Sequence, residues 1–251
     1  MDTIVTALAD QQSELTTILA GFDDLDWTQP SRCEGWTAAD VVLHLCQTNE
    51  MAIGSASGRF PEALADLTAG LPPAADVDAG AALMVARDRG LTLDALRDRW
   101  HTTADDLCAA LTACDPHARV TWVAGELSAR TLATTRLAET WIHTGDVADA
   151  VGADVGPTDR LWHIARLAWR TLPYAFARAG RELSGPVAFD LTGPGGERWA
   201  FSAADTPLTT ITGDAIDLCL VAARRAEPGS TGLRGRGPDA EAVLGLVRTY
   251  A

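Results

Sequence analysis

The amino-acid sequence predicts an α+β protein in two parts, a helical bundle over residues 1–181 and a smaller α+β domain over residues 182–251. Apolar residues recur at helical spacing through most of the first part. At about residue 183 the pattern changes to short alternating segments that are separated by turn residues, which is typical of strands. A length of 251 residues accommodates two modest domains.

Two amphipathic helices are predicted at the start of the chain. The first has apolar residues at helical spacing and ends at Gly21. After a loop with two tryptophans, Thr37 begins the second helix, and Asp40 follows at the position of a capping box. His44 shares a face with Val41, so a histidine lies on the stripe that should face the core.

Further helical patterns cover residues 81–114, 128–152 and 158–180. Before them, a segment rich in Pro, Gly, Ala and Asp reads as a loop with short helical pieces, residues 58–79. We expect a break near Gly90, an end at Gly152, a cap at Thr158 and a kink or split at Pro173. Val120 begins a short apolar stretch between two of these helices.

The second part begins with a predicted β-hairpin around the turn Pro194-Gly195-Gly196-Glu197. Residues 187–193 and 198–203 form its strands, and residues 209–212 are a third strand candidate. Helices are predicted at 214–225 and 239–250.

The composition of the chain limits the classes of partner that it can have. The net charge is −14, which disfavours nucleic acid and anionic membranes as partners. Neither a basic leader region nor an apolar run long enough for a membrane span is present. The five cysteines form no CxxC pair and read as free thiols. We therefore expect a cytoplasmic protein, monomeric or homodimeric, whose partner is a small molecule.

One face of the helix at 128–152 carries unusually many ionisable residues. Its members are Leu132, Arg136, Glu139, His143, Asp146 and Ala150. Glu139 and His143 are one helical turn apart, so a carboxylate oxygen and an imidazole nitrogen can converge on one ion. His44 is the best candidate for a third ligand. Two imidazoles and one carboxylate are typical of an open zinc site.

Two carboxylates lie one turn from these histidines. Asp146 follows His143 and Asp40 precedes His44, so each can hold an imidazole N–H from outside the ligand set. Spacing alone leaves other interpretations open. A Glu/His pair one turn apart is more often a solvated helix face, and a histidine on an apolar face is more often a hydrogen-bonded core residue.

Several segments resemble the DinB-like, mycothiol-dependent maleylpyruvate isomerase superfamily. The first signature is similar to Pro30-Ser31 followed by EGWTAADVVLHL at 34–45, and the second to RLAETWIHTGDV at 136–147. Looser similarity continues at PTDRL, residues 157–161, and at TITGDAIDLC, residues 210–219. The resemblance spans nearly the whole chain and points to an uncharacterised metal-binding branch rather than to the isomerase itself.

The resemblance implies a four-helix bundle followed by a sterol-carrier-like domain. It also implies that His44, Glu139 and His143 are the metal ligands, with zinc or another divalent metal as cofactor. In the family an arginine after the C-terminal helix helps to hold an anionic substrate, and Arg224 or Arg225 falls nearest that position. The alternative for both is a positive charge that complements the helix dipole.

Three functions follow from this resemblance. The first is a metal-dependent isomerase or thiol transferase that uses mycothiol on a small electrophilic molecule. The second is a thiol-independent Lewis-acid enzyme, a cyclase, hydrolase or lyase. The third is a non-catalytic small-molecule-binding protein in which the metal is structural.

Overall fold

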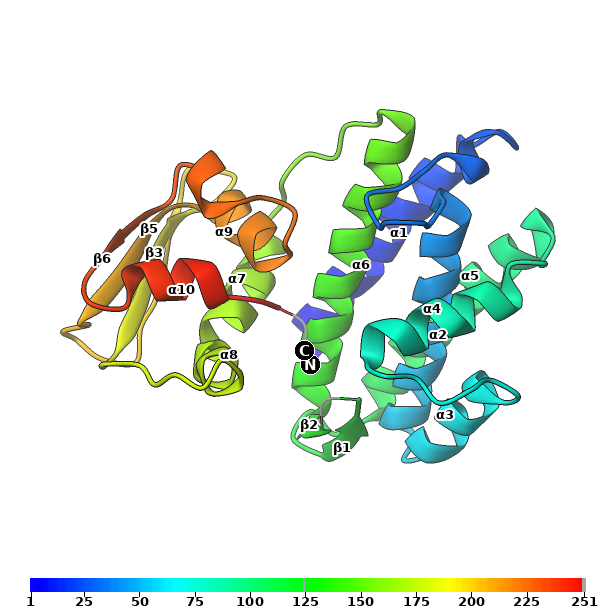
Figure 1. Cartoon of the computed structure of the whole chain (residues 1–251), viewed down its shortest axis with the longest axis horizontal. Helices are drawn as coiled ribbons and strands as arrows, with labels where there is room; N and C mark the ends of the chain where they lie inside the picture. Colours follow the sequence, from blue (N-terminus) through cyan, green and yellow to red (C-terminus); the bar gives the residue numbers. More distant parts are fainter. Residues whose placement is uncertain (124, 250–251) are drawn as a thin grey trace. The chain divides into compact units, whose positions relative to one another are not determined.

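The computed structural model describes residues 1–123 and 125–249. The chain divides into two compact units, Met1–Val155 and Gly156–Ala251 (Figure 1). The first is almost entirely helical and the second combines helices with a small mixed sheet. The predicted α+β class is confirmed.

Four long helices build the first unit. They are α1 (Asp2–Ala20), α2 (Ala38–Ala56), α5 (Leu93–Ala113) and α6 (Ala129–Val151). Both α1 and α2 pack against α5 and α6, which closes a four-helix arrangement (Figure 1). The core between α2 and α5 includes the buried side chains of Leu45, Val42 and Trp100. The expected four-helix bundle is therefore present.

Shorter elements decorate the bundle. They are the 3-10 helix η1 (Asp26–Thr28), the helices α3 (Phe60–Thr68) and α4 (Val77–Asp88), and the strands β1 (Arg119–Trp122) and β2 (Gly125–Ser128). The break predicted near Gly90 separates α4 from α5, and Thr92 caps α5 by accepting a bond from Ala95 N–H. β1 and β2 form an antiparallel hairpin, of which the sequence showed only the apolar stretch.

The helices that carry the site residues begin and end at sequence signals. The predicted capping box of α2 is confirmed, since Thr37 Oγ1 accepts a bond from Asp40 N–H and Asp40 Oδ2 accepts one from Thr37 N–H. Ser128 caps α6 by accepting a bond from Thr131 N–H. α6 is terminated by Gly152, directly after its last residue, whose φ of 67° is the left-handed conformation that glycine adopts without strain.

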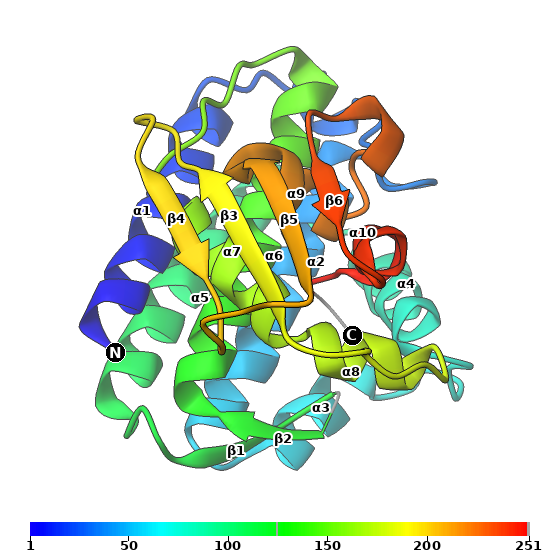
Figure 2. The same ribbon diagram turned by 90° about the vertical axis from the view of Figure 1, so that its left-hand side faces the viewer.

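The second unit contains a four-stranded mixed sheet with the strand order β4–β3–β5–β6 (Figure 2). The strands are β3 (Val187–Thr192), β4 (Arg198–Phe201), β5 (Thr209–Asp214) and β6 (Arg234–Arg236). β3 and β4 form the predicted hairpin, with Phe189 opposite Phe201. β5 pairs with β3 in parallel, so the chain crosses from one side of β3 to the other. The sequence analysis missed β6.

Helices accompany this sheet. They are α7 (Leu161–Arg170), α8 (Leu172–Arg178), α9 (Ala215–Ala222) and α10 (Ala240–Leu246), with the 3-10 helix η2 (Pro228–Ser230). The predicted helix at 158–180 is split into α7 and α8, and Pro173 lies in the first turn of α8. Thr158 is not a cap, because α7 begins at Leu161. Tyr250, the predicted end of the last helix, lies outside the described residues.

The division between the two compact units falls after Val155, whereas the sequence pattern suggested a boundary between residues 181 and 182. The difference arises because α7 packs on α9 and β4 of the second unit. Trp169 on α7 donates a hydrogen bond to Val187 O at 2.8 Å and stacks on Phe201. Helical spacing identifies an apolar face but not the element that covers it.

Within the described part of the chain, no helix combines the length and the apolar character that crossing a bilayer would need.

Candidate metal centre

Three side chains from two helices converge inside the first unit. His44 lies in the middle of α2, and Glu139 and His143 lie one turn apart on α6. Glu139 Oε1 is 3.2 Å from His44 Nε2 and 3.5 Å from His143 Nε2. The two imidazole rings meet edge to face with their centroids 5.2 Å apart. The candidate ligands predicted from the sequence are thus neighbours in space.

The spacing of these atoms is informative. A tetrahedral ion with metal–ligand bonds of about 2.0–2.1 Å separates its ligand atoms by about 3.3 Å. The observed separations of 3.2 and 3.5 Å lie on either side of that value. One ligand atom from each of His44, Glu139 and His143 lies within 4.8 Å of the others. This donor set fits a divalent ion such as zinc and leaves one position for an external ligand.

Asp146 orients one of these imidazoles. Its carboxylate, which is 1% exposed, accepts a hydrogen bond from His143 Nδ1 at 2.9 Å. That bond leaves Nε2 of His143 to face Glu139. The predicted contact between Asp146 and His143 is therefore present, and a carboxylate in that position would fix the tautomer and the ring orientation of a ligating histidine.

Cys33 lies on the same side of His143 as Asp146. Its thiol donates to Asp146 Oδ2 at 3.4 Å, and its sulfur is 3.9 Å from His143 Nδ1. Cys33, His143 and Asp146 form a second group that could hold an ion. The 2.9 Å contact between His143 and Asp146 is a hydrogen-bond distance, so we assign this group to orienting the imidazole. The sequence analysis treated Cys33 only as a free thiol.

The loop before α2 places Cys33 and Trp36 over the site. Ser31 N–H and Ser31 Oγ both donate to Trp36 O at 2.9 Å, which closes the loop into a tight turn. Gly35 has a φ of 76°, which the turn requires. Trp36 then packs its ring against His44, with centroids 5.1 Å apart. Nothing in helical spacing could reveal this contact, because the loop is irregular.

Asp40 does not hold His44, contrary to the sequence-based expectation. Its carboxylate accepts bonds from Thr37 and makes a two-pronged ion pair with Arg89, at 2.8 and 3.0 Å. His44 Nδ1 is buried and has no hydrogen-bond partner among the residues that the structure describes. The capping role of Asp40 turns its side chain toward the helix terminus and away from the next turn.

Burial and pairing shift the pKa values of all three candidate ligands. Burial lowers the pKa of His44, and the hydrogen bond with Glu139 only partly opposes it. Burial favours neutral Glu139, but hydrogen bonds with His143 and His44 outweigh it and hold its pKa well below the usual value. Burial disfavours charged His143, but hydrogen bonds with Asp146, Cys33 and Glu139 raise its pKa well above the usual value. Both shifts favour a charged pair, a carboxylate at Glu139 and a protonated imidazole at His143.

Arg136 lies one turn before Glu139 on α6, and the sequence analysis gave it no role. Its side chain is almost fully buried, with 2% exposed. Nη2 donates to Thr48 Oγ1 at 2.8 Å and to Asn49 Oδ1 at 3.3 Å, and both residues belong to α2. Thr48 Oγ1 in turn donates to His44 O at 2.9 Å. This chain of bonds connects the two helices that carry the candidate ligands.

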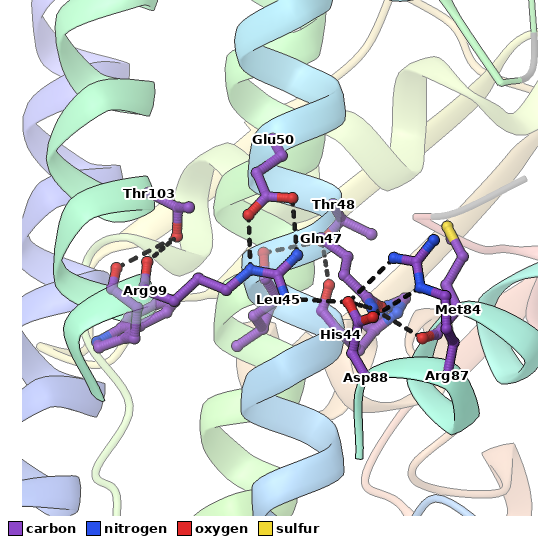
Figure 3. Close-up of polar contacts among 11 residues, drawn as sticks. His44, Leu45, Gln47, Thr48, Glu50, Met84, Arg87, Asp88, Arg99 and Thr103 are labelled. Carbon is purple, nitrogen blue, oxygen red and sulfur yellow. Dashed lines mark hydrogen bonds and ion pairs between the residues drawn. The ribbon is translucent and has the colours of Figure 1, made fainter. Parts of the chain in front are cut away.

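A network of charges holds α2 from another side (Figure 3). Arg99 on α5 donates two bonds to Glu50, at 2.7 and 2.8 Å, and one to Asp88, at 3.0 Å. Asp88 also accepts bonds from Gln47 and Arg87, and these contacts hold its pKa below the usual value. Gln47 and Glu50 follow His44 within two turns of α2, so the network fixes the helix that presents His44.

The two arginines that the family resemblance suggested for substrate binding belong to the second unit. Arg224 has a φ of 58° and donates to Gly245 O at 3.0 Å. Arg225 donates to Ala223 O at 3.2 Å. The guanidinium of Arg224 thus contacts a main-chain carbonyl of α10, and that of Arg225 contacts one that directly follows α9. Their role toward a substrate stays a prediction.

Comparison with known proteins agrees with this architecture. The family model of the mycothiol maleylpyruvate isomerase N-terminal domain matches residues 8–148. Two uncharacterised proteins of Mycobacterium tuberculosis are each 30% identical to this chain, over 97% of it and 97% of their own length.

Solved structures resemble the chain as well. A mycothiol-dependent maleylpyruvate isomerase and its histidine-to-alanine mutant align with a TM-score of 0.62 over 95% of each chain. Their identities of 21% and 19% establish the fold alone. Because the family model matches more than half of the chain, this protein belongs to the mycothiol maleylpyruvate isomerase family.

Proposed function

We propose that this chain is a metal-dependent enzyme that uses mycothiol, either as an isomerase or as a thiol transferase, on a small electrophilic molecule. The observation that carries the proposal is the convergence of His44 and His143 on Glu139 Oε1. Family membership supports the thiol, since the related isomerases are mycothiol-dependent. Two imidazoles and one carboxylate with an open position are typical of zinc enzymes, and another divalent metal would suit the same donors.

Each residue has a defined task in this proposal. His44 and His143 present Nε2, Glu139 presents a carboxylate oxygen, and Asp146 holds the Nδ1 proton of His143. The side chain of Glu139 is 24% exposed, so a small molecule can approach the cluster from its side. A bound divalent ion would lower the pKa of a coordinated thiol and so supply a nucleophile at neutral pH.

The thiol chemistry then decides between the two reactions. A thiolate that adds to an activated double bond leaves a single bond that can rotate, and its departure regenerates both the double bond and the thiolate. That sequence isomerises the substrate. If the thiol remains attached and the adduct takes up a proton, the reaction is thiol transfer.

Elemental analysis tests the metal site. We expect one equivalent of metal in the wild type and none in Glu139→Gln, because the carboxamide lacks the charged ligand oxygen. Glu126→Gln changes an exposed glutamate on β2 and should retain the metal. Metal in Glu139→Gln at the wild-type level would show that the site has been misassigned.

Calorimetric titration tests the thiol. Mycothiol should bind the metal-loaded protein, and its S-methyl derivative should bind more weakly because it cannot form a thiolate. If the metal-loaded protein binds neither compound at millimolar concentrations, the proposed use of mycothiol is refuted. The thiol-independent Lewis-acid alternative would then take its place.

A further inference from the structure

The charge of Arg136 has no counterion at close range. No carboxylate of the described residues lies within ion-pair distance of its guanidinium group, whose partners Thr48 and Asn49 are neutral. Its Nε is buried without a hydrogen-bond partner. The nearest acidic neighbour along α6, Glu139, directs Oε1 at the two imidazoles instead. A buried cation in this situation is costly unless something else balances it.

Arginine cannot relieve this cost by losing its proton. Burial lowers the pKa of Arg136, and the charge of Glu139 partly opposes this shift. A guanidinium nevertheless remains protonated in proteins. The positive charge is therefore a permanent feature of the bundle interior beside the candidate ligands.

The permanent charge of Arg136 affects the net charge of the site when a divalent ion is bound. A divalent ion, the carboxylates of Glu139 and Asp146, and the guanidinium of Arg136 together carry one net positive charge. Without Arg136 the same groups would be neutral. A ligand that brings one negative charge to the open position of the ion would balance the site, whereas a neutral ligand would not.

We propose that Arg136 makes the metal centre select an anionic ligand, a thiolate or a carboxylate, for the open position of the ion. The inference rests on the proposed metal site and adds the ligand class to it. Arg136 acts through the field of its charge in this proposal. Its hydrogen bonds to Thr48 and Asn49 are a separate, structural contribution that a test must distinguish.

Three variants separate charge from structure. Arg136→Met removes both the charge and the hydrogen bonds. Arg136→Gln removes the charge but keeps an N–H donor for α2, which also protects against a failure to fold. Arg136→Lys keeps the charge without the planar fork. Arg130→Met removes a positive charge from the first turn of the same helix and serves as the matched control.

The experiment loads each protein with Co²⁺ and titrates it with azide, an anion, or with imidazole, a neutral ligand, while the visible spectrum of the metal is followed. We expect azide affinity to fall about tenfold in the Met and Gln variants, which is the scale of one partly screened charge. Imidazole affinity should stay within about twofold of the wild type. The Lys variant and the Arg130 control should bind both ligands as the wild type does.

The possible outcomes distinguish an effect of the Arg136 charge from a structural role of its side chain. Equal weakening of azide and imidazole in Arg136→Gln, or loss of azide affinity in Arg136→Lys, would overturn the inference in favour of a structural role. Unchanged azide affinity in Arg136→Met would overturn it as well while leaving the metal site intact. If the wild type binds no Co²⁺, the proposed function fails first and this inference fails with it.

Discussion

Replacement of Asp146 by asparagine removes the negative charge that accepts the 2.9 Å hydrogen bond from His143 Nδ1. Carboxylates behind a ligating histidine contribute about 10- to 100-fold to metal affinity. The asparagine amide can still turn its oxygen toward Nδ1, so we expect about tenfold weaker zinc binding, or about 1.4 kcal/mol. Asp146→Ala removes the acceptor altogether, and we expect about 100-fold.

Competition with a chromophoric zinc chelator measures these affinities directly. Asp40→Asn is the matched control, because Asp40 is also buried and also lies one turn from a candidate ligand. Its carboxylate serves the capping box of α2 and Arg89 instead of His44. We expect unchanged zinc affinity and a loss of about 1 kcal/mol in the free energy of unfolding. For a chain of this size that loss lowers Tm by about 2–4 °C.

Asp146→Asn should therefore lower the zinc affinity, whereas Asp40→Asn should lower only the free energy of unfolding. Unchanged zinc affinity in both Asp146 variants would refute the assignment of Asp146 as the residue that holds His143. A loss in Asp40→Asn as large as that in Asp146→Asn would show that both aspartates act on the ion alike, contrary to the contacts of Asp40 with Thr37 and Arg89.

Three further predictions concern the first unit. In the metal-free protein, the raised pKa of His143 contributes stability below its ordinary value of 6.5, and this stability is lost as pH rises through the raised value. The lowered pKa of Glu139 contributes stability above its ordinary value of 4.5, and this stability is lost as pH falls. Urea unfolding across pH should show both losses, and a flat profile would contradict them. Cys33→Ala should retain one equivalent of zinc, because its thiol faces Nδ1 of His143 rather than Nε2; a metal-free variant would instead make Cys33 a ligand. Arg99→Met should lower the free energy of unfolding by about 2 kcal/mol, since it leaves Glu50 partly buried without its cation and removes one of the two arginines that pair with Asp88. Arg97→Met should cost less than half as much, because the partner of Arg97, Asp94, is exposed.

Local signals explain why much of the first unit could be predicted. The start of α2 is marked by Thr37 and Asp40, and the two ends of α6 are marked by Ser128 and Gly152. These signals can be recognised in the sequence because capping depends on residues within one turn. The hairpin of β3 and β4 follows from its turn residues for the same reason. β6 escaped prediction because its three residues are exposed and lack an apolar alternation.

The sequence by itself determined which side chains share a helix face, including Glu139, His143 and Asp146 on α6. That information is present because helical geometry is fixed by the backbone. Tertiary structure decided the rest. It placed α2 against α6 so that His44 meets Glu139, turned Asp40 to Arg89, folded the loop that carries Cys33 over His143, and left Arg136 without a counterion. These contacts join residues far apart in the chain, and only packing of the apolar faces determines them.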